Sequence, residues 1–92
     1  MKNFSVGEVV SSSKGRDLSQ FYMVYKFDGK NLLLVNGSNK TLLHPKAKNS
    51  NHVISHQTIL ENIKSKLENG KVVYDAEIYS ALKKFKELKK GE

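Results

Sequence analysis

Between Val6 and Ile54 the apolar residues come in short runs, and the second run has the period of two that is typical of a β-strand. The residues that carry this pattern are Val6, Val9 and Val10, then Phe21, Met23, Tyr25 and Phe27, then Leu32 to Val35, then Leu42 and Leu43, and finally Val53 and Ile54. The pattern predicts five short strands in close succession. Such a succession is typical of a small barrel.

Turn sequences that contain glycine separate these runs. Asp28-Gly29 lies between two runs, and it can supply the positive φ angles that a tight hairpin requires. The segment Asn36-Gly37-Ser38-Asn39 predicts a second turn one hairpin later. Tyr22 and Val24 fill the alternate positions of the second run, so both faces of that strand are partly apolar. We therefore expect an added element, the C-terminal segment, to cover one face.

After His56 the apolar period lengthens to about 3.6 residues, which indicates helices. Thr58 and Glu61 have the spacing of a capping box, and Asn69-Gly70 is typical of a left-handed helix end. Asp75 is the expected N-cap of a second helix. The predicted apolar faces are Ile59, Leu60, Ile63 and Leu67 in the first helix, and Ile78, Leu82, Phe85 and Leu88 in the second. The expected fold is mainly β, with a small five-stranded barrel over residues 1–55 and two C-terminal α-helices over residues 56–92 that pack on it as one structural unit.

The length of 92 residues suits one domain with a single modest core. The chain has no cysteine, which excludes a disulfide framework and a cysteine-based zinc site. No uninterrupted apolar run, Leu32 to Val35 included, comes near the roughly 20 residues that a membrane span needs. The first residues do not have the pattern of a secretory signal or a transit peptide. We therefore expect a cytoplasmic protein.

The net charge of +7 favours polyanionic partners, and RNA, DNA and anionic lipid all remain open on charge alone. The distribution of charge is more informative, because no acidic residue occurs between Asp28 and Glu61. Within this stretch, His44 to His52 is predicted to be a loop from its proline and its polar run. The candidate ligands for phosphate and sugar oxygens are Lys40, His44, Lys46, Lys48, Asn49 and His52. An ordinary solvated loop is the alternative interpretation.

A second candidate is the segment Lys14-Gly15-Arg16-Asp17, between the first two predicted strands. Gly15 allows a positive φ angle or a close approach of the backbone to a ligand. Arg16 is the only arginine, and its guanidinium can bind a phosphate with two hydrogen bonds or stack on a base. The alternative is a tight turn in which Arg16 pairs with Asp17 at the surface.

Two further groups of residues are open to a structural and a functional interpretation. Lys83, Lys84, Lys86, Lys89 and Lys90 form the polar face of the second predicted helix, and we expect a solvated helix end, with phosphate contact as the alternative. Phe21, Tyr25 and Phe27 are expected in the core, because they share one strand face. Tyr22 lies on the other face and is a candidate for stacking on a base.

Enzymatic activity has no support in the sequence. The chain lacks a phosphate-binding Gly-Lys-Ser/Thr loop, and Ser11-Ser12-Ser13 lacks the glycines that flank a nucleophilic serine. His52 and His56 have the spacing of zinc ligands on a helix, but they lie at a predicted strand end and linker, without a third ligand. We expect no catalytic site, no metal and no cofactor.

The order of several short motifs resembles a known family. Residues Val6-Gly7-Glu8-Val9-Val10, Ser13-Lys14-Gly15-Arg16-Asp17, Phe21 and Val24 look like a KOW motif, an RNA-binding segment of ribosomal and transcription-elongation proteins. The continuation through Pro45-Lys46-Ala47-Lys48-Asn49, His52, the Thr58 helix, Gly70-Lys71-Val72 and Asp75-Ala76-Glu77-Ile78 is similar to the short bacterial KOW-domain RNA-binding proteins. Those proteins resemble the fourteen-e class of large-subunit ribosomal proteins. The resemblance covers about residues 4–85, with Leu18-Ser19 where the family usually has a glycine.

This resemblance implies an SH3-like barrel that binds structured RNA, with Lys14, Gly15 and Arg16 in one loop and Lys46, Lys48, Asn49 and His52 in another. It implies ribosomal RNA of the large subunit as partner, together with neighbouring ribosomal proteins. Contacts made mainly by lysine favour recognition of phosphates and shape over the reading of bases. An SH3-like module that binds other proteins is the alternative, since such barrels also bind peptides in aromatic grooves.

Overall fold

A computed structural model describes residues 3–13 and 20–90 of the chain. Its elements are the strands β1 (Glu8–Ser12), β2 (Phe21–Asp28), β3 (Asn31–Val35), β4 (Lys46–Asn49) and β5 (Val53–Ile59), the 3-10 turn η1 (Ser50–His52), and the helices α1 (Glu61–Glu68) and α2 (Asp75–Lys90). The strands form one antiparallel sheet in the order β4-β3-β2-β1-β5. The expected fold of mainly β class, with five strands followed by two helices, is confirmed.

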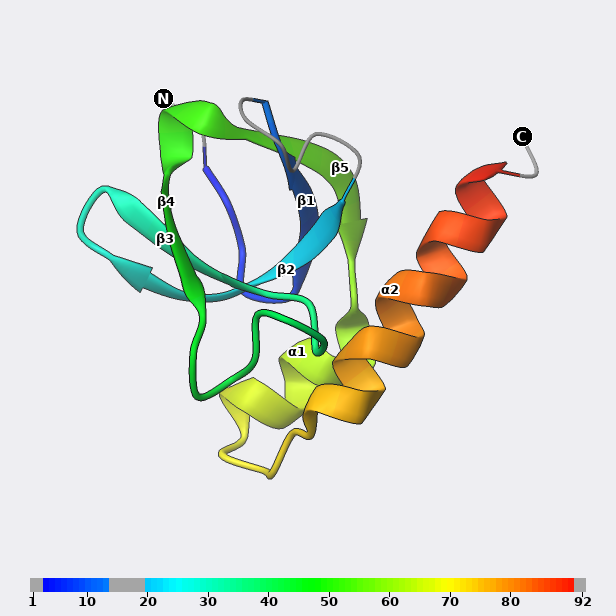
Figure 1. Ribbon diagram of the computed structural model, residues 1–92. Coiled ribbons are helices and arrows are strands. Elements are labelled where there is room, and N and C mark those ends of the chain that lie inside the picture. Colours follow the sequence, from blue (N-terminus) through cyan, green and yellow to red (C-terminus); the bar gives the residue numbers. More distant parts are fainter. Residues whose placement is uncertain (1–2, 14–19, 91–92) are drawn as a thin grey trace.

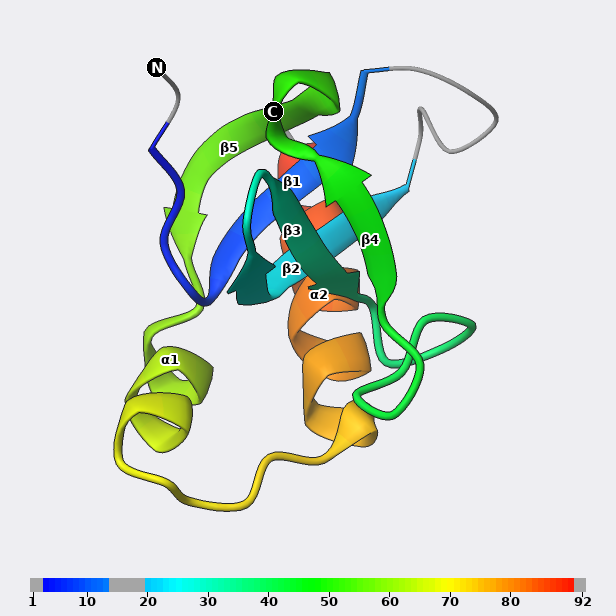
Figure 2. The same ribbon diagram turned by 90° about the vertical axis from the view of Figure 1, so that its left-hand side faces the viewer.

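The sheet curls strongly without closing, because β4 and β5 are its two edges (Figures 1 and 2). The short η1 connects these edges, and the backbone N–H of Ser13 at the end of β1 donates to the carbonyl of His52 at 2.9 Å. The N–H of Ser50 donates to the carbonyl of Lys30 in the β2–β3 turn at 3.2 Å. One end of the curled sheet therefore gathers η1, the end of β1 and the β2–β3 turn.

Two apolar clusters lie on opposite faces of the sheet. The inner cluster fills the curl and consists of Val10, Tyr22, Val24, Leu32, Leu34 and Val53, with Phe4 against it. The outer cluster joins the sheet to the helices and consists of Val9, Met23, Val35, Ile63, Ile78 and Leu82. All five residues of β1 are buried, since this strand lies between β2 and β5 and is covered on both faces. The expectation that the C-terminal helices cover one face of the sheet is thus confirmed.

An irregularity in β2 changes the face on which its later residues lie. The pairing of β2 with β3 passes from Val24↔Leu34 to Lys26↔Leu33, so Tyr25 is an extra, bulged residue. Phe27 then lies opposite Leu32, and its side chain is 51% exposed. The prediction that Phe27 shares a core face with Phe21 and Tyr25 is therefore wrong, whereas those two pack partly buried against the outer cluster.

The predicted strand at Leu42 and Leu43 is absent, and the predicted loop after it contains β4 instead. The N–H of Leu42 donates to Asp75 Oδ1 at 2.8 Å, and the Leu43 side chain is 86% exposed. The ladder with β3 supplies hydrogen bonds to the polar segment Lys46–Asn49, and the lysine stems can lie along apolar surface. Pairing with a neighbouring strand thus outweighs the polar composition of this segment.

The start of α1 also differs from the prediction. Thr58 and Ile59 belong to β5, which pairs with β1 as far as Glu8↔Ile59, beyond an irregularity in register after Val10↔Ser55. The N-cap position of α1 is Leu60, without a side-chain cap, so Thr58 and Glu61 form no capping box. At the other end, Gly70 has a φ of 68° and the Lys71 N–H donates to the Lys66 carbonyl at 2.8 Å, which confirms the left-handed helix end.

The N-terminus of α2 lies against the turn that follows β3. Asp75 is the first helical residue, not the N-cap that the sequence predicted, and its carboxylate accepts the N–H of Leu42. Glu77 Oε2 accepts the N–H of Tyr74, the residue before the helix, at 3.3 Å. Glu77 also binds Lys66 of α1 at 3.0 Å. The last part of α2 extends beyond the sheet (Figure 1), so Leu88 is 66% exposed instead of packing as expected.

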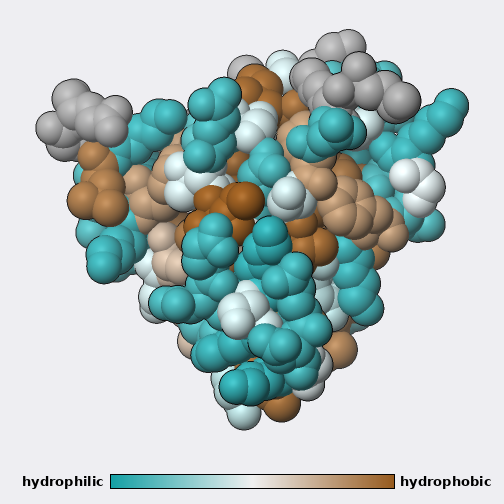
Figure 3. Space-filling model, turned by 180° about the vertical axis from the view of Figure 1, so that it is seen from behind, coloured by the Kyte–Doolittle hydropathy of each residue, from teal (hydrophilic) through white to brown (hydrophobic). Residues whose placement is uncertain are grey.

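Within residues 3–13 and 20–90, neither helix is long and apolar enough to cross a membrane. Seen from behind, hydrophilic surface surrounds smaller apolar areas (Figure 3). The exposed large apolar residues lie in β2, the β3–β4 segment, β5, the α1–α2 linker and α2, and they are Phe27, Leu43, Ile54, Val72, Tyr74, Tyr79 and Leu88. Charged and amide-lined surfaces are accordingly the better candidates for a binding site.

Candidate functional site

Four of the predicted site residues come together on β4 and η1. Lys46 lies opposite Leu34 and Lys48 opposite Leu32 in the antiparallel ladder, so both lysines lie on the same face as the inner cluster. Asn49 is the N-cap of η1, where its side chain accepts the Asn51 N–H at 2.9 Å. His52 ends η1 and is partly buried. We call the pair Lys46 and Lys48 the β4 face; Asn49 and His52 follow it at the end of the strand and in η1.

The electrostatics of the β4 face are those of two cations held close together. The Nζ atom of Lys46 lies 5.8 Å from the ring centroid of Tyr22. Burial lowers the pKa of Lys46 below the usual lysine value, and the neighbouring charge of Lys48 lowers it further. Because the chain has no carboxylate side chain between Asp28 and Glu61, β4, η1 and β5 contribute no acidic residue of their own to this face.

The remaining predicted residues do not all join this face. Lys40 and His44 lie in the segment between β3 and β4, which contacts the N-terminus of α2 at the other end of β4. Lys14, Gly15 and Arg16 lie outside the described residues. Ser13, the last described residue before them, donates its N–H to the His52 carbonyl.

Tyr22 was the candidate for base stacking, and the structure contradicts it. This residue is 1% exposed within the inner cluster, since β1 and β3 flank it and it lies inside the curl of the sheet. Its hydroxyl donates to Gln20 Oε1 at 3.1 Å, and burial raises the pKa of this hydroxyl. The ring therefore supports Lys46 from below and offers no free surface to a base.

His56 joins the sheet to α2. Its ring packs edge-on against Phe21 at 4.9 Å and against Phe85 at 6.0 Å between centroids. Nε2 lies 2.9 Å from Ser11 Oγ, and Nδ1 lies 3.3 Å from Lys89 Nζ. An ammonium can only donate, so we assign the proton of the neutral ring to Nε2. Burial and then the Lys89 charge lower the pKa of His56, so this histidine has a structural role in its neutral form.

No group of three or more His, Asp or Glu side chains that could hold a metal ion occurs in the part of the chain that the structure describes. His52 and His56, which have the spacing of helical ligands, lie in η1 and β5 instead of on a helix.

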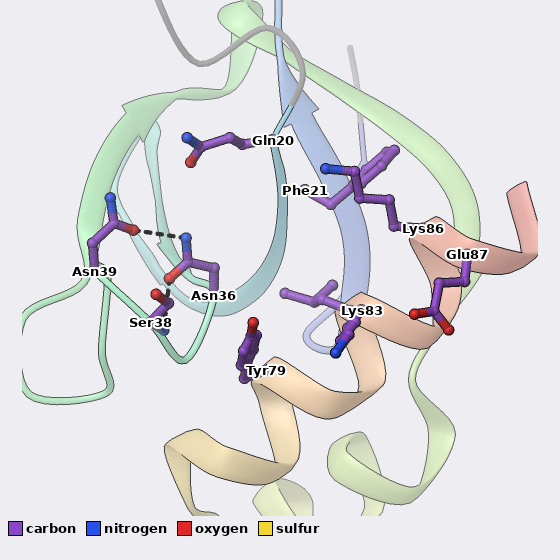
Figure 4. A pocket seen from close by; sticks show the side chains of 10 residues that line it. Gln20, Phe21, Asn36, Ser38, Asn39, Tyr79, Lys83, Lys86 and Glu87 are labelled. Atoms are coloured by element: carbon purple, nitrogen blue, oxygen red, sulfur yellow. Dashed lines mark hydrogen bonds between the residues drawn. The ribbon is translucent and has the colours of Figure 1, made fainter. Parts of the chain in front are cut away.

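A second surface feature is a groove that the sequence did not predict. This groove of about 580 Å³ lies between the start of β2, the turn after β3 and one side of α2 (Figure 4). Its lining residues are Gln20, Phe21, Asn36, Ser38, Asn39, Tyr79, Leu82, Lys83, Lys86 and Glu87. The only sequence signal for it is the spacing of Lys83 and Lys86, which places them on one side of α2, whereas Lys84 does not line the groove.

Comparison of the sequence with models of protein families and with curated proteins finds no match.

Proposed function

We propose that the protein is a non-catalytic RNA-binding module of the cytoplasm, which docks on folded ribosomal RNA of the large subunit through its basic barrel surface. The observation that carries this proposal is the pair Lys46 and Lys48 on one face of an edge strand, in a stretch of chain that contains no acidic residue. The resemblance to short KOW-domain proteins supports the choice of RNA and of the ribosome as partner.

The chemistry of the β4 face suits phosphates better than bases. Lysine is a compact point charge that binds phosphate without selecting a base. The lowered pKa of Lys46 reflects burial and repulsion by Lys48, and a phosphate between the two ammonium groups relieves that repulsion. Side chains cannot read the deep groove of A-form RNA, so a lysine row matches the backbone and shape of a folded RNA.

The test is binding of labelled fragments of large-subunit ribosomal RNA, measured by fluorescence anisotropy at several salt concentrations. About five phosphate contacts give a slope of log K against log salt of roughly −3.5 to −4.5. We expect Lys46→Gln and Lys48→Gln each to make this slope shallower by about 0.7 to 0.9. Lys84→Gln, which removes the same charge from an exposed position of α2, is the matched control and leaves the slope nearly unchanged.

The ribosomal partner is tested separately by sedimentation of the tagged protein in a lysate of its own cells, at low and at high salt. Comigration with the large ribosomal subunit in both gradients supports the proposal, and a protein that stays at the top of both contradicts it. Absence of salt-dependent RNA binding, together with binding of peptides, would instead favour an SH3-like module for protein interaction.

A further inference from the structure

The groove described above is separate from the β4 face but adjoins it. Lys46 lies over the Tyr22 ring, the Tyr22 hydroxyl donates to Gln20, and Gln20 lines the groove. These contacts place the groove close to the β4 face. The groove volume of about 580 Å³ falls within the range of roughly 300–1,000 Å³ that is usual for small-ligand sites.

One wall of the groove is cationic. Lys83 and Lys86 are separated by one helical turn on α2, and the Lys86 ammonium points across the groove in Figure 4. Glu87 also lines the site, on its outer side, so the inner part of this wall carries two positive charges. Two cations at this spacing suit the phosphates on either side of one nucleotide.

The floor of the groove is aromatic. Tyr79 is 46% exposed, and its side chain lies between the cationic wall and the turn (Figure 4). The backbone of Gly37 packs so closely behind it that a Cβ on Gly37 would lie 3.0 Å from the Tyr79 Cβ and 2.7 Å from its nitrogen. This contact fixes the base of the Tyr79 side chain and leaves the ring accessible for stacking.

The opposite wall offers amide and hydroxyl groups. The Asn36 side chain is occupied within the turn, since it donates to Asn39 Oδ1 at 2.8 Å and accepts the N–H groups of Ser38 and Lys40, each at 3.0 Å. This network holds Asn39 in place, whose Nδ2 can donate to a ligand, as can the Nε2 of Gln20 and the hydroxyl of Ser38. Donors of this kind can bond to the edge of a base.

We infer that this groove binds one unpaired nucleotide of an RNA, with its base against Tyr79, its edge toward the Asn39 wall and its phosphates on Lys83 and Lys86. The inference rests on the proposed RNA-binding function and adds the kind of RNA structure that is selected: a helix that carries a bulged or looped-out nucleotide beside the backbone contacted by the β4 face. An acidic peptide also satisfies the two lysines, so competition by such a peptide is a separate outcome of the test.

The test compares a fully paired RNA hairpin with a hairpin that differs only in having one bulged nucleotide. The bulged hairpin is made in four versions, one for each base at the bulge. Binding is measured by fluorescence anisotropy at fixed salt. We expect the wild-type protein to prefer the bulged hairpin. Tyr79→Leu is expected to weaken binding of the bulged hairpin by roughly 5- to 150-fold, the range found when a stacking side chain is removed. The same change leaves binding of the paired hairpin within about 2-fold, because the β4 face is intact. Tyr79→Phe keeps the ring and is expected to retain the preference.

Charge variants give an independent measurement that does not touch the packing around Gly37. Lys83→Gln combined with Lys86→Gln is expected to lower the preference for the bulged hairpin, whereas Lys84→Gln, on the same helix and outside the groove, does not. A preference for the bulged hairpin that survives in Tyr79→Leu and in the double lysine variant overturns the inference. Equal binding of both hairpins by the wild-type protein overturns it as well, and so does displacement of the bulged hairpin by an acidic peptide. If the wild-type protein binds neither hairpin, the proposed function itself fails.

Discussion

The contact between Gly37 and the start of α2 allows a sharp prediction about stability. Gly37 has a φ of 75°, and a Cβ built on it would lie 2.2 Å from the carbonyl oxygen of Asp75 and 2.7 Å from the nitrogen of Tyr79. Both neighbours are backbone atoms of α2, so neither can rotate away. In the variant Gly37→Ala, the turn and the helix must therefore move apart.

The expected loss of stability in Gly37→Ala has two parts. The left-handed backbone alone costs a residue with a Cβ about 1–2 kcal/mol. Separation of the turn from α2 also breaks the hydrogen bond from the Leu42 N–H to the Asp75 carboxylate. Hydrogen bonds to charged groups contribute about 1.5–3 kcal/mol to stability. We expect Gly37→Ala to lower the free energy of unfolding by roughly 2.5–5 kcal/mol.

Two other glycines provide the controls. Gly29 and Gly70 have φ angles of 60° and 68°, and a Cβ on either would meet nothing within 4 Å. Gly29→Ala and Gly70→Ala should therefore lose only the backbone part, about 1–2 kcal/mol. Urea unfolding followed by circular dichroism gives the three differences, provided that the slopes of the transitions agree. If Gly37→Ala loses no more than the two controls, the close packing of the turn on α2 is refuted.

Three further predictions concern the core, the histidine and the link between the helices. Ile78 is fully buried, so Ile78→Ala should cost about 2–5 kcal/mol in urea unfolding, while Leu88→Ala at an exposed position should stay within about 0.5 kcal/mol; equal losses would contradict the docking of α2. The pKa of His56 is lowered in the folded state, so the unfolded chain takes up its proton first, and the melting temperature should fall as the pH drops below about 6.5. His56→Gln should remove this part of the pH dependence, and an unchanged profile in that variant would assign it to other groups. The hydrogen bond from Lys66 lowers the pKa of Glu77, so Glu77→Gln should lose less than about 1 kcal/mol near pH 7 and nothing below the folded pKa of Glu77; a loss that persists in acid would mean that the ion pair is not its cause.

The sequence was informative wherever a local rule decides the structure. The apolar runs at Phe21 and Leu32, the glycine between them and the left-handed end of α1 all depend on residues close together in the chain. The apolar stripe of α2 indicated its buried side as far as Phe85. The partly apolar character of both faces of β2 also indicated, correctly, that the helices cover the sheet.

The errors arose where a contact with a distant segment outweighs local preference. The composition of Lys46–Asn49 predicts a polar loop. The segment forms a strand instead, because it pairs with β3 through a ladder of backbone hydrogen bonds. The spacing of Thr58 and Glu61 predicts a helix cap, but Thr58 stays in β5 because β5 pairs with β1 as far as Ile59. The bulge at Tyr25 moves Phe27 to the other face, and its position depends on the register with β3.

For the candidate site, the amino-acid sequence by itself determined which residues carry charge and where carboxylates are missing, because charge is a property of each side chain. It could not place Lys46 and Lys48 on one face or bury Tyr22 beneath them, because both facts depend on the register of β4 and on the curl of the sheet. Only the tertiary structure brought Gln20, the turn at Asn36–Asn39 and the Lys83 side of α2 around one groove. These segments are far apart in the chain, and the packing of α2 on the turn is what joins them.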